Sequence, residues 1–268
     1  MDSEERKLPR WALVGISVLL AFGYLTFALS RHRGPNSPSP VEPSSPERNP
    51  APLAIAATQS VFTSTSTNQR VETGEDRVVV LVTEGNELLA RGDYAEAAGK
   101  YQQALAITPG EEDLHYNLAI ALAKLGKTEE AKTQYAEALE IYPEYSDAHN
   151  NLGNLLMNEN KLDEAIEHFR EATRVMPENA SFHNNLGTAF GRQGKTSEAI
   201  AEFQEAVKRR PAYLEARVNL ANAYLAAGRV EEAIPQINEA LRLQPNFEPA
   251  LRAMQRARQK QAFNRAPQ

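Results

Sequence analysis

Cysteine is absent from the 268 residues of this chain. Without a thiol the chain can form no disulfide framework, no thiolate metal site and no lipid-modified cysteine. The sequence also lacks a glycine-rich phosphate loop, a Gly-x-Ser-x-Gly nucleophile elbow and a His-Glu-x-x-His zinc helix. We therefore expect no catalytic residue, no cofactor, no metal site and no small-molecule substrate, and the chain itself is not predicted to be an enzyme.

An excess of basic charge is missing as well. The chain carries 29 basic and 35 acidic side chains, for a net charge of −6. Residues 78–247 are the most acidic part, with 16 basic against 26 acidic side chains, whereas residues 248–268 carry a net charge of +4. Because an acidic surface repels phosphate groups, nucleic acid is not an expected partner. Residues 248–268 are interpreted as a polar capping helix, with a basic tail for an anionic partner as the alternative.

Proline recurs with a strict period of 34 residues. The five prolines concerned are Pro109, Pro143, Pro177, Pro211 and Pro245. A fixed period of this size is typical of a solenoid, in which one supersecondary unit stacks on copies of itself. Counting back from each proline gives units at 78–111, 112–145, 146–179, 180–213 and 214–247.

Other positions of the unit recur too. Position 8 is small and position 20 is always alanine, so that two helices can cross closely. Position 15 is glycine, or asparagine in the third unit, which favours the left-handed turn that ends a first helix. The proline at position 32 ends a second helix, and Thr128 and Thr196 are expected to cap the second helices of their units. Each unit is therefore predicted to be two helices joined by tight turns.

These positions resemble the tetratricopeptide repeat (TPR) family. The shared features are leucine followed by a small residue at positions 7 and 8 (except for Glu84 in the first unit), alanine at 20 and 27, an aromatic residue at 24 and proline at 32. The resemblance covers residues 78–247 and implies an all-α, right-handed superhelix of five repeats, with residues 248–268 as its capping helix and tail. Position 4, often tryptophan in the family, departs from the pattern with His115, His149 and His183, which we interpret as filling the inter-helix contact. Pro235 is expected to kink the last second helix.

Residues 1–77 differ in composition from the repeats. After an N-terminal tail, 1–10, residues 11–30 contain no charge and are long enough to span a bilayer as a single helix. Residues 31–77 are rich in Pro, Ser and Thr and are predicted to be a disordered linker. The competing interpretation of 11–30 is a cleaved signal peptide. Flanking arginines favour, by a small margin, an array on the extracytoplasmic, periplasmic side of a single-pass membrane protein.

Asparagine recurs in the first helices. In relatives with this fold, positions 5, 6 and 9 of the first helix line the concave groove, and an asparagine amide matches the N–H and C=O of an extended peptide. The strip resembles the asparagine ladder of O-linked N-acetylglucosamine transferases; alternatively, these residues solvate the groove or bond neighbouring repeats. The predicted peptide-binding residues are Asn86, Asn117, Asn150, Asn151, Asn154, Asn184, Asn185, Asn219 and Asn222.

The function expected from this resemblance is a membrane-tethered scaffold for protein–protein interaction, which holds peptide segments of other proteins in its groove. Two alternatives remain open. One is an assembly factor of the cell envelope, similar to anchored TPR proteins of cytochrome c maturation, and the other is a partner that recruits substrates to a separate enzyme. The lysine and asparagine clamp by which some TPR proteins bind chaperone tails is not expected, because Asp147 and Glu215 stand where basic residues are needed.

Overall fold

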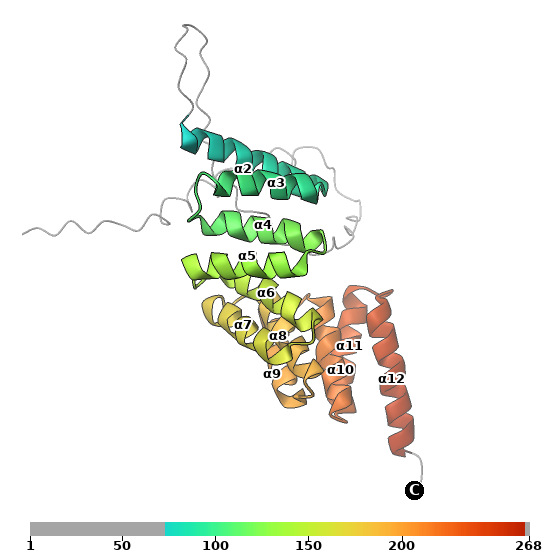
Figure 1. The fold of residues 1–268 in the computed structure, drawn as a ribbon. Helices are drawn as coiled ribbons and strands as arrows, with labels where there is room; N and C mark the ends of the chain where they lie inside the picture. The colour runs from blue at the N-terminus through green and yellow to red at the C-terminus, as the bar shows by residue number, and fades with distance from the viewer. Residues whose placement is uncertain (1–72, 266–268) are drawn as a thin grey trace, which may run out of the picture. The chain divides into compact units, whose positions relative to one another are not determined.

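The computed structural model describes residues 73–265, which form eleven α-helices and no strand (Figure 1). Ten of the helices make five antiparallel pairs, one pair for each predicted repeat. The pairs are α2 (Gly74–Arg91) with α3 (Tyr94–Leu105), α4 (Glu112–Lys124) with α5 (Thr128–Ile141), α6 (Ser146–Asn158) with α7 (Leu162–Val175), α8 (Ala180–Arg192) with α9 (Thr196–Arg209), and α10 (Leu214–Ala226) with α11 (Val230–Leu243). The eleventh helix, α12, spans Glu248–Arg265.

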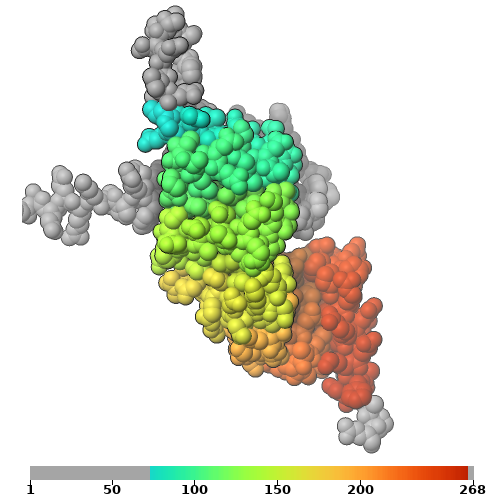
Figure 2. All heavy atoms as spheres, viewed as in Figure 1, coloured from blue at the N-terminus to red at the C-terminus, as the bar shows by residue number. Residues whose placement is uncertain are grey.

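The pairs stack in chain order. Each helix packs against the next one along the chain, and the first helices α6, α8 and α10 also contact one another. In the space-filling view the colours follow the order of the sequence without mixing, since each repeat borders only its neighbours (Figure 2). Helix α12 covers both α10 and α11. The predicted solenoid with a C-terminal capping helix is confirmed.

The turns inside the repeats have the predicted left-handed backbone. Gly92, Gly126, Gly194 and Gly228 have φ between 75° and 89°, and Asn160 has φ of 62°. Any other residue would be strained there, because a Cβ atom disfavours positive φ. The second helices end two to four residues before the periodic prolines, as expected.

Two helix starts differ from the prediction. The first helix begins at Gly74 rather than at 78, because Thr73 and Asp76 form a capping box in which each side chain accepts a hydrogen bond from the backbone N–H of the other residue. The linker predicted for 31–77 therefore ends earlier. Thr128 and Thr196 are not caps: each is the first helical residue, and the cap positions are Lys127 and Lys195, which make no side-chain capping bond.

Pro235 lies inside α11, which runs as one helix from Val230 to Leu243. The proline cannot donate a hydrogen bond to the carbonyl of Glu231. Because Pro235 and Glu231 are both exposed, water can bind that carbonyl, and the helix continues.

The core repeats one contact from unit to unit. In the first, third and fourth repeats, the aromatic ring at position 24 lies directly against the glycine at position 8 of the same repeat. A Cβ atom added to Gly153 would lie 2.8 Å from the ring of Phe169, and one added to Gly85 would lie 2.7 Å from the ring of Tyr101. The alanines at positions 20 and 27 are completely or almost completely buried. Small residues thus bring the two helices of a repeat close enough to enclose one ring.

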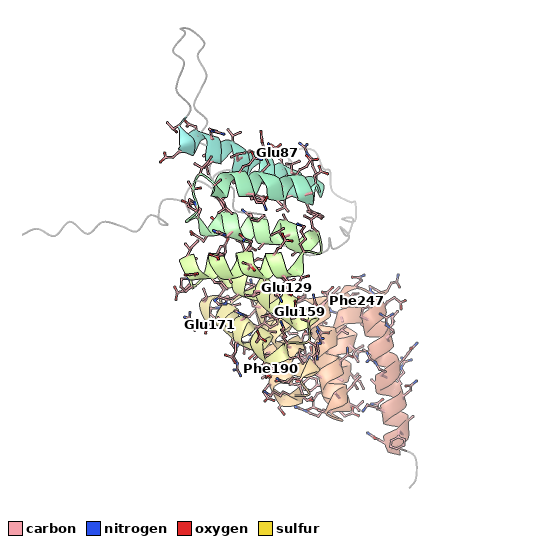
Figure 3. The ribbon with its side chains drawn as sticks, in the orientation of Figure 1. Glu87, Glu129, Glu159, Glu171, Phe190 and Phe247 are labelled. Atoms are coloured by element: carbon pink, nitrogen blue, oxygen red, sulfur yellow. The ribbon has the colours of Figure 1, made fainter. Side chains whose placement is uncertain are left out.

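An ion-pair bridge joins the second and third repeats. The Nζ atom of Lys132 on α5 lies 2.7 Å from carboxylate oxygens of both Glu129, on the same helix, and Glu159, at the end of α6. The two glutamates lie next to each other in Figure 3. Hydrogen bonds from Lys132 and Lys161 lower the pKa of Glu159 to about 2. Glu159 therefore remains charged, and the bridge remains formed, at any pH in the physiological range.

The predicted membrane helix, 11–30, and most of the predicted linker lie outside the described residues. Between residues 73 and 265, no helix combines the length and the apolar character that crossing a bilayer requires.

Candidate functional site

The asparagines predicted to bind peptide lie on the first helices of the repeats, on a surface that we call the first-helix wall (α2, α4, α6, α8 and α10). Asn117 and Asn184 are buried, with 4% and 7% of their surface exposed. The other seven are half-buried: Asn86, Asn150, Asn151, Asn154, Asn185, Asn219 and Asn222. Partial burial is compatible with a binding surface, but the hydrogen bonds of each residue decide which amides are free to bind a guest.

Three of these asparagines connect consecutive repeats. The Nδ2 atom of Asn185 donates to Oδ1 of Asn150 at 2.8 Å, and that of Asn219 donates to Oδ1 of Asn184 at 2.9 Å. In the same way Asn151 donates to the hydroxyl of Tyr116 at 3.2 Å. In each case position 6 of one repeat donates to position 5 of the repeat before it. The alternative that these residues bond neighbouring repeats is therefore correct for this part of the strip.

The inter-repeat bond does not use the whole amide. An asparagine side chain has two N–H donors and an oxygen that accepts. Asn185 and Asn219 each use one N–H for the hydrogen bond to the previous repeat. Their oxygens accept no hydrogen bond from a described residue. Asn219 also lines a cavity of about 300 Å³ among α8, α9 and α10, together with Thr188 and Asn222. An acceptor and a donor thus remain available on each of two successive repeats.

The ends of the strip are already occupied. The hydroxyl of Tyr101 donates to Oδ1 of Asn86 at 2.8 Å, and Arg256 of α12 donates to Oδ1 of Asn222 at 2.9 Å. Asn86 and Asn222 are therefore held by the array itself. The open part of the predicted site lies between these two residues, in the third to fifth repeats.

An aromatic and acidic cluster lies in the second repeat, where Tyr116 stands at position 5 in place of the asparagine of the third and fourth repeats. The rings of Tyr116 and Tyr145 lie 4.7 Å apart, and the hydroxyl of Tyr145 donates to Oδ1 of Asp113 at 2.7 Å. Burial raises the pKa of Asp147 above its ordinary value, and it raises the pKa of Tyr116 well above that of a free tyrosine. Sequence reasoning missed this cluster, although Tyr116 stands at position 5, one of the positions expected in the groove. The wall is thus acidic and aromatic toward its N-terminal end.

The histidines at position 4 do not simply fill space in place of tryptophan. The Nε2 atoms of His115, His149 and His183 lie 3.1, 3.0 and 2.9 Å from the carbonyl oxygens of the prolines that close the preceding repeats. In the last repeat, Nε of Arg217 donates to the equivalent carbonyl, that of Pro211, at 2.7 Å. A donor at position 4 therefore ties each repeat to the turn before it. Tryptophan could provide one such N–H, whereas histidine and arginine can form a second hydrogen bond as well.

The second hydrogen bond reaches position 23 of the same repeat. Nδ1 of His149 lies 2.9 Å from Nδ1 of His168, and Nδ1 of His183 lies 2.7 Å from a carboxylate oxygen of Glu202. Burial, together with the neighbouring His149, lowers the pKa of His168, whereas the hydrogen bond to Glu202 raises the pKa of His183. Within residues 73–265 no three potential ligands come together to hold a metal ion, since each histidine has its own separate partners.

These two histidines should respond to pH in opposite directions. The folded state disfavours the proton on His168. The stability of the fold should therefore decrease as the pH drops below about 6.5, the pKa of histidine in the unfolded chain. The folded state favours the proton on His183. The stabilisation that His183 provides is therefore complete below about pH 6.5, and it is lost as the pH rises through the raised pKa of the folded state. We expect His168→Gln to reduce the loss of stability between pH 7 and pH 5, because Gln134 and Gln236 occupy position 23 in other repeats. His183→Gln should reduce the loss above about pH 6.5.

The measurement is the midpoint of urea unfolding, monitored by circular dichroism, for the two variants and the original chain at pH 5, 6, 7 and 8. An acid-side loss that is as large in His168→Gln as in the original chain would contradict the assignment to His168.

Comparisons with known proteins agree with this architecture. The family described as tetratricopeptide repeat matches residues 116–181 and 184–248, and the family described as TPR repeat matches residues 85–126. The chain belongs to the tetratricopeptide repeat family. No curated protein sequence matched the chain.

Solved structures with the same fold include two proteins, YrrB and MamA. The crystal structure of YrrB, described as a TPR protein with an unusual peptide-binding site, is 20% identical with a TM-score of 0.58, and the match covers 66% of this chain and 92% of that one. MamA from Desulfovibrio magneticus RS-1 is 20% identical with a TM-score of 0.60, covering 65% of this chain and 98% of that one. MamA AMB-1 is 26% identical with a TM-score of 0.55, and the match covers 66% of this chain and 98% of that one.

Proposed function

We propose that this chain is a scaffold for protein–protein interaction, which binds an extended segment of another protein along the first-helix wall. The observation that carries the proposal is the unused donor and acceptor on the amides of Asn185 and Asn219, in successive repeats. Asn219 also lines a cavity of about 300 Å³. A peptide backbone offers the complementary N–H and C=O groups at regular intervals. Binding through these groups depends little on the guest's side chains, so the scaffold would accept segments of varied sequence.

The description of YrrB as a TPR protein with a peptide-binding site supports a peptide as the guest. The inter-repeat bonds support it as well, because they hold the amides in place before a guest arrives. A binding surface that is already ordered loses less side-chain entropy on association.

We also propose that residues 11–30 anchor the scaffold in a membrane as a single-pass helix. The support is twenty consecutive residues without charge, flanked by Arg10 and Arg31. A chain that lacks residues 1–30 is expected to leave the membrane fraction, while the full chain should resist extraction with alkaline carbonate. Release of the full chain by carbonate would contradict the anchor.

Removing the two open amides tests the binding surface. In the double variant Asn185→Ala/Asn219→Ala, we expect crosslinking in native cells to recover partner proteins at least about tenfold less well, because one lost hydrogen bond in a desolvated site costs about 1 kcal/mol or more. The matched control is Asn238→Ala, since Asn238 is exposed on α11, a second helix.

Circular dichroism should show the same helix content in all three proteins. Undiminished partner recovery by a folded double variant would remove the asparagine strip from the proposal, and recovery of no partner by the original chain would remove the scaffold itself.

A further inference from the structure

A cavity with an apolar floor and an acidic rim opens at the first repeat. Its volume is about 290 Å³, and it lies between α2 and the N-terminal end of α4. The floor includes Val78, Val79 and Val82, and the rim carries the carboxylates of Glu75, Glu111 and Asp113. Val79 leaves 44% of its surface exposed. An apolar side chain and a cation on the same guest would therefore find complementary surfaces here.

Polar groups that line the cavity lack partners within the array. None of its three carboxylates forms a salt bridge within residues 73–265; Asp113 accepts only the hydroxyl of Tyr145. Asn117 also lines the cavity and is 4% exposed, and its Oδ1 atom is buried without a hydrogen-bond partner. Position 5 of the previous repeat is Val82, so Asn117 also lacks the acceptor that Asn150 offers to the Nδ2 atom of Asn185. A donor from an occupant, reached by rotating the Asn117 amide, would remove this cost.

The other end of the array presents the opposite surface. Helix α12 buries Ala250, Ala253 and Ala257 against the last repeat. Its exposed side carries Arg252, Arg256, Lys260 and Phe263 at intervals of four, four and three residues, which places them along one face. Phe263 is 82% exposed, the highest value among the large apolar residues that the structure describes. Arg252 pairs with Glu248 and Arg256 donates to Asn222, whereas Lys260 forms no ion pair with a described residue. An exposed aromatic ring next to a basic side chain calls for a partner that is apolar and acidic.

We propose that the free end of α12 in one copy docks into the first-repeat cavity of a second copy. Phe263 packs on the valines of the floor, and Lys260, one turn earlier on the same face, lies against Glu75 and Glu111. Within one molecule the contact cannot form, because the cavity belongs to the first repeat and α12 covers the last (Figure 1). The contact is head-to-tail. A docked pair therefore keeps one free first-repeat cavity at one end and one free α12 at the other, where further copies can bind. The proposal is independent of the asparagine strip in the third to fifth repeats.

Engineered cysteines test this contact directly, because the chain has none of its own. Gly110→Cys places a thiol beside Glu111, where an added Cβ meets no atom within 4 Å, and Asn264→Cys places one beside Phe263 while keeping that ring. When the two full-length variants are mixed under mild oxidation, we expect the mixed disulfide dimer to dominate. The matched control replaces Asn264→Cys with Asn238→Cys on the exposed face of α11. The proposal would be overturned if Asn264→Cys and Asn238→Cys gave equal yields of mixed dimer with Gly110→Cys. It would also be overturned if the Gly110→Cys homodimer formed in larger amount than the mixed dimer.

Binding of a fluorescent peptide with the sequence of residues 248–268 to the full chain gives the second readout. Peptides carrying Lys260→Glu or Phe263→Ala should bind at least about tenfold more weakly, and so should the original peptide to a chain carrying Glu111→Lys. Combining Glu111→Lys in the chain with Lys260→Glu in the peptide should restore part of the affinity, and added salt should weaken the original pair. Asn185→Ala/Asn219→Ala should leave peptide binding unchanged, which separates this proposal from the scaffold function. A scrambled peptide that binds as well as the original would show nonspecific attraction of a basic peptide and would refute the docking.

Discussion

Replacing Phe169 with alanine is expected to lower the free energy of unfolding by about 3–5 kcal/mol, as for other completely buried aromatic residues. Phe169 has no exposed surface, and its ring fills the space left by Gly153 in the same repeat. We expect the backbone of α6 and α7 not to collapse onto the missing ring, because Ala165 and Ala172, on either side of Phe169 on α7, are already completely buried. A cavity of the size of the ring should therefore remain.

The consequence should extend beyond the third repeat. In a solenoid, the repeats on either side are stabilised only through their neighbours, and the third repeat is the middle one. We expect urea unfolding of Phe169→Ala, followed by circular dichroism, to show a lower midpoint and a broader transition. Phe263→Ala is the matched control, because Phe263 is 82% exposed; in dilute solution its midpoint should equal that of the original chain. A loss of less than about 1 kcal/mol in Phe169→Ala would contradict the assigned packing.

Replacing Gly187 with valine is the change with the second largest expected effect, a loss of about 1–3 kcal/mol or more. The first atom of the new side chain would lie 2.8 Å from the ring of Phe203 and 3.2 Å from the backbone oxygen of Ala199. The ring is buried, and the oxygen belongs to the helix backbone, so neither can move without separating α8 from α9. Valine would also add two methyl groups to this crowded site.

The same substitution four residues later provides the control. Gly191 is exposed on the same helix, and an added Cβ meets only the Cβ of Ala199, at 3.9 Å. Valine should be tolerated there, since a glycine inside a helix is itself unfavourable. The thermal midpoints of the two variants, measured by circular dichroism, should differ clearly, with Gly187→Val lower. Equal midpoints would show that the helices of this repeat are not in the tight contact described.

The architecture of the repeats could be predicted because its determinants are local in the chain. A left-handed turn at Gly194, or at Asn160, depends on one residue, and the proline period sets where each second helix ends. The start of α2 was missed because Thr73 and Asp76 precede the first periodic unit, so that no repeat pattern marks them. The caps expected at Thr128 and Thr196 were wrong by one residue, because a hydroxyl residue next to acidic residues is equally compatible with the first helical position.

The hydrogen bonds of the wall could not be predicted, because they join residues 35 positions apart and depend on how one repeat is rotated against the next. Asn185 and Asn150 stood in the expected strip, but only the stacking shows that one amide donates to the other. The same holds for Asn117, whose oxygen is buried without a hydrogen-bond partner in the stacked array.

By itself, the sequence determined that this protein is a stack of five helical pairs, because a pattern repeated five times averages out the ambiguity of any one segment. Only the tertiary structure decided which polar groups on that stack are used up and which remain open. The reason is that the chain carries far more donors and acceptors than the fold consumes, and the surplus becomes visible only when neighbouring repeats are in place.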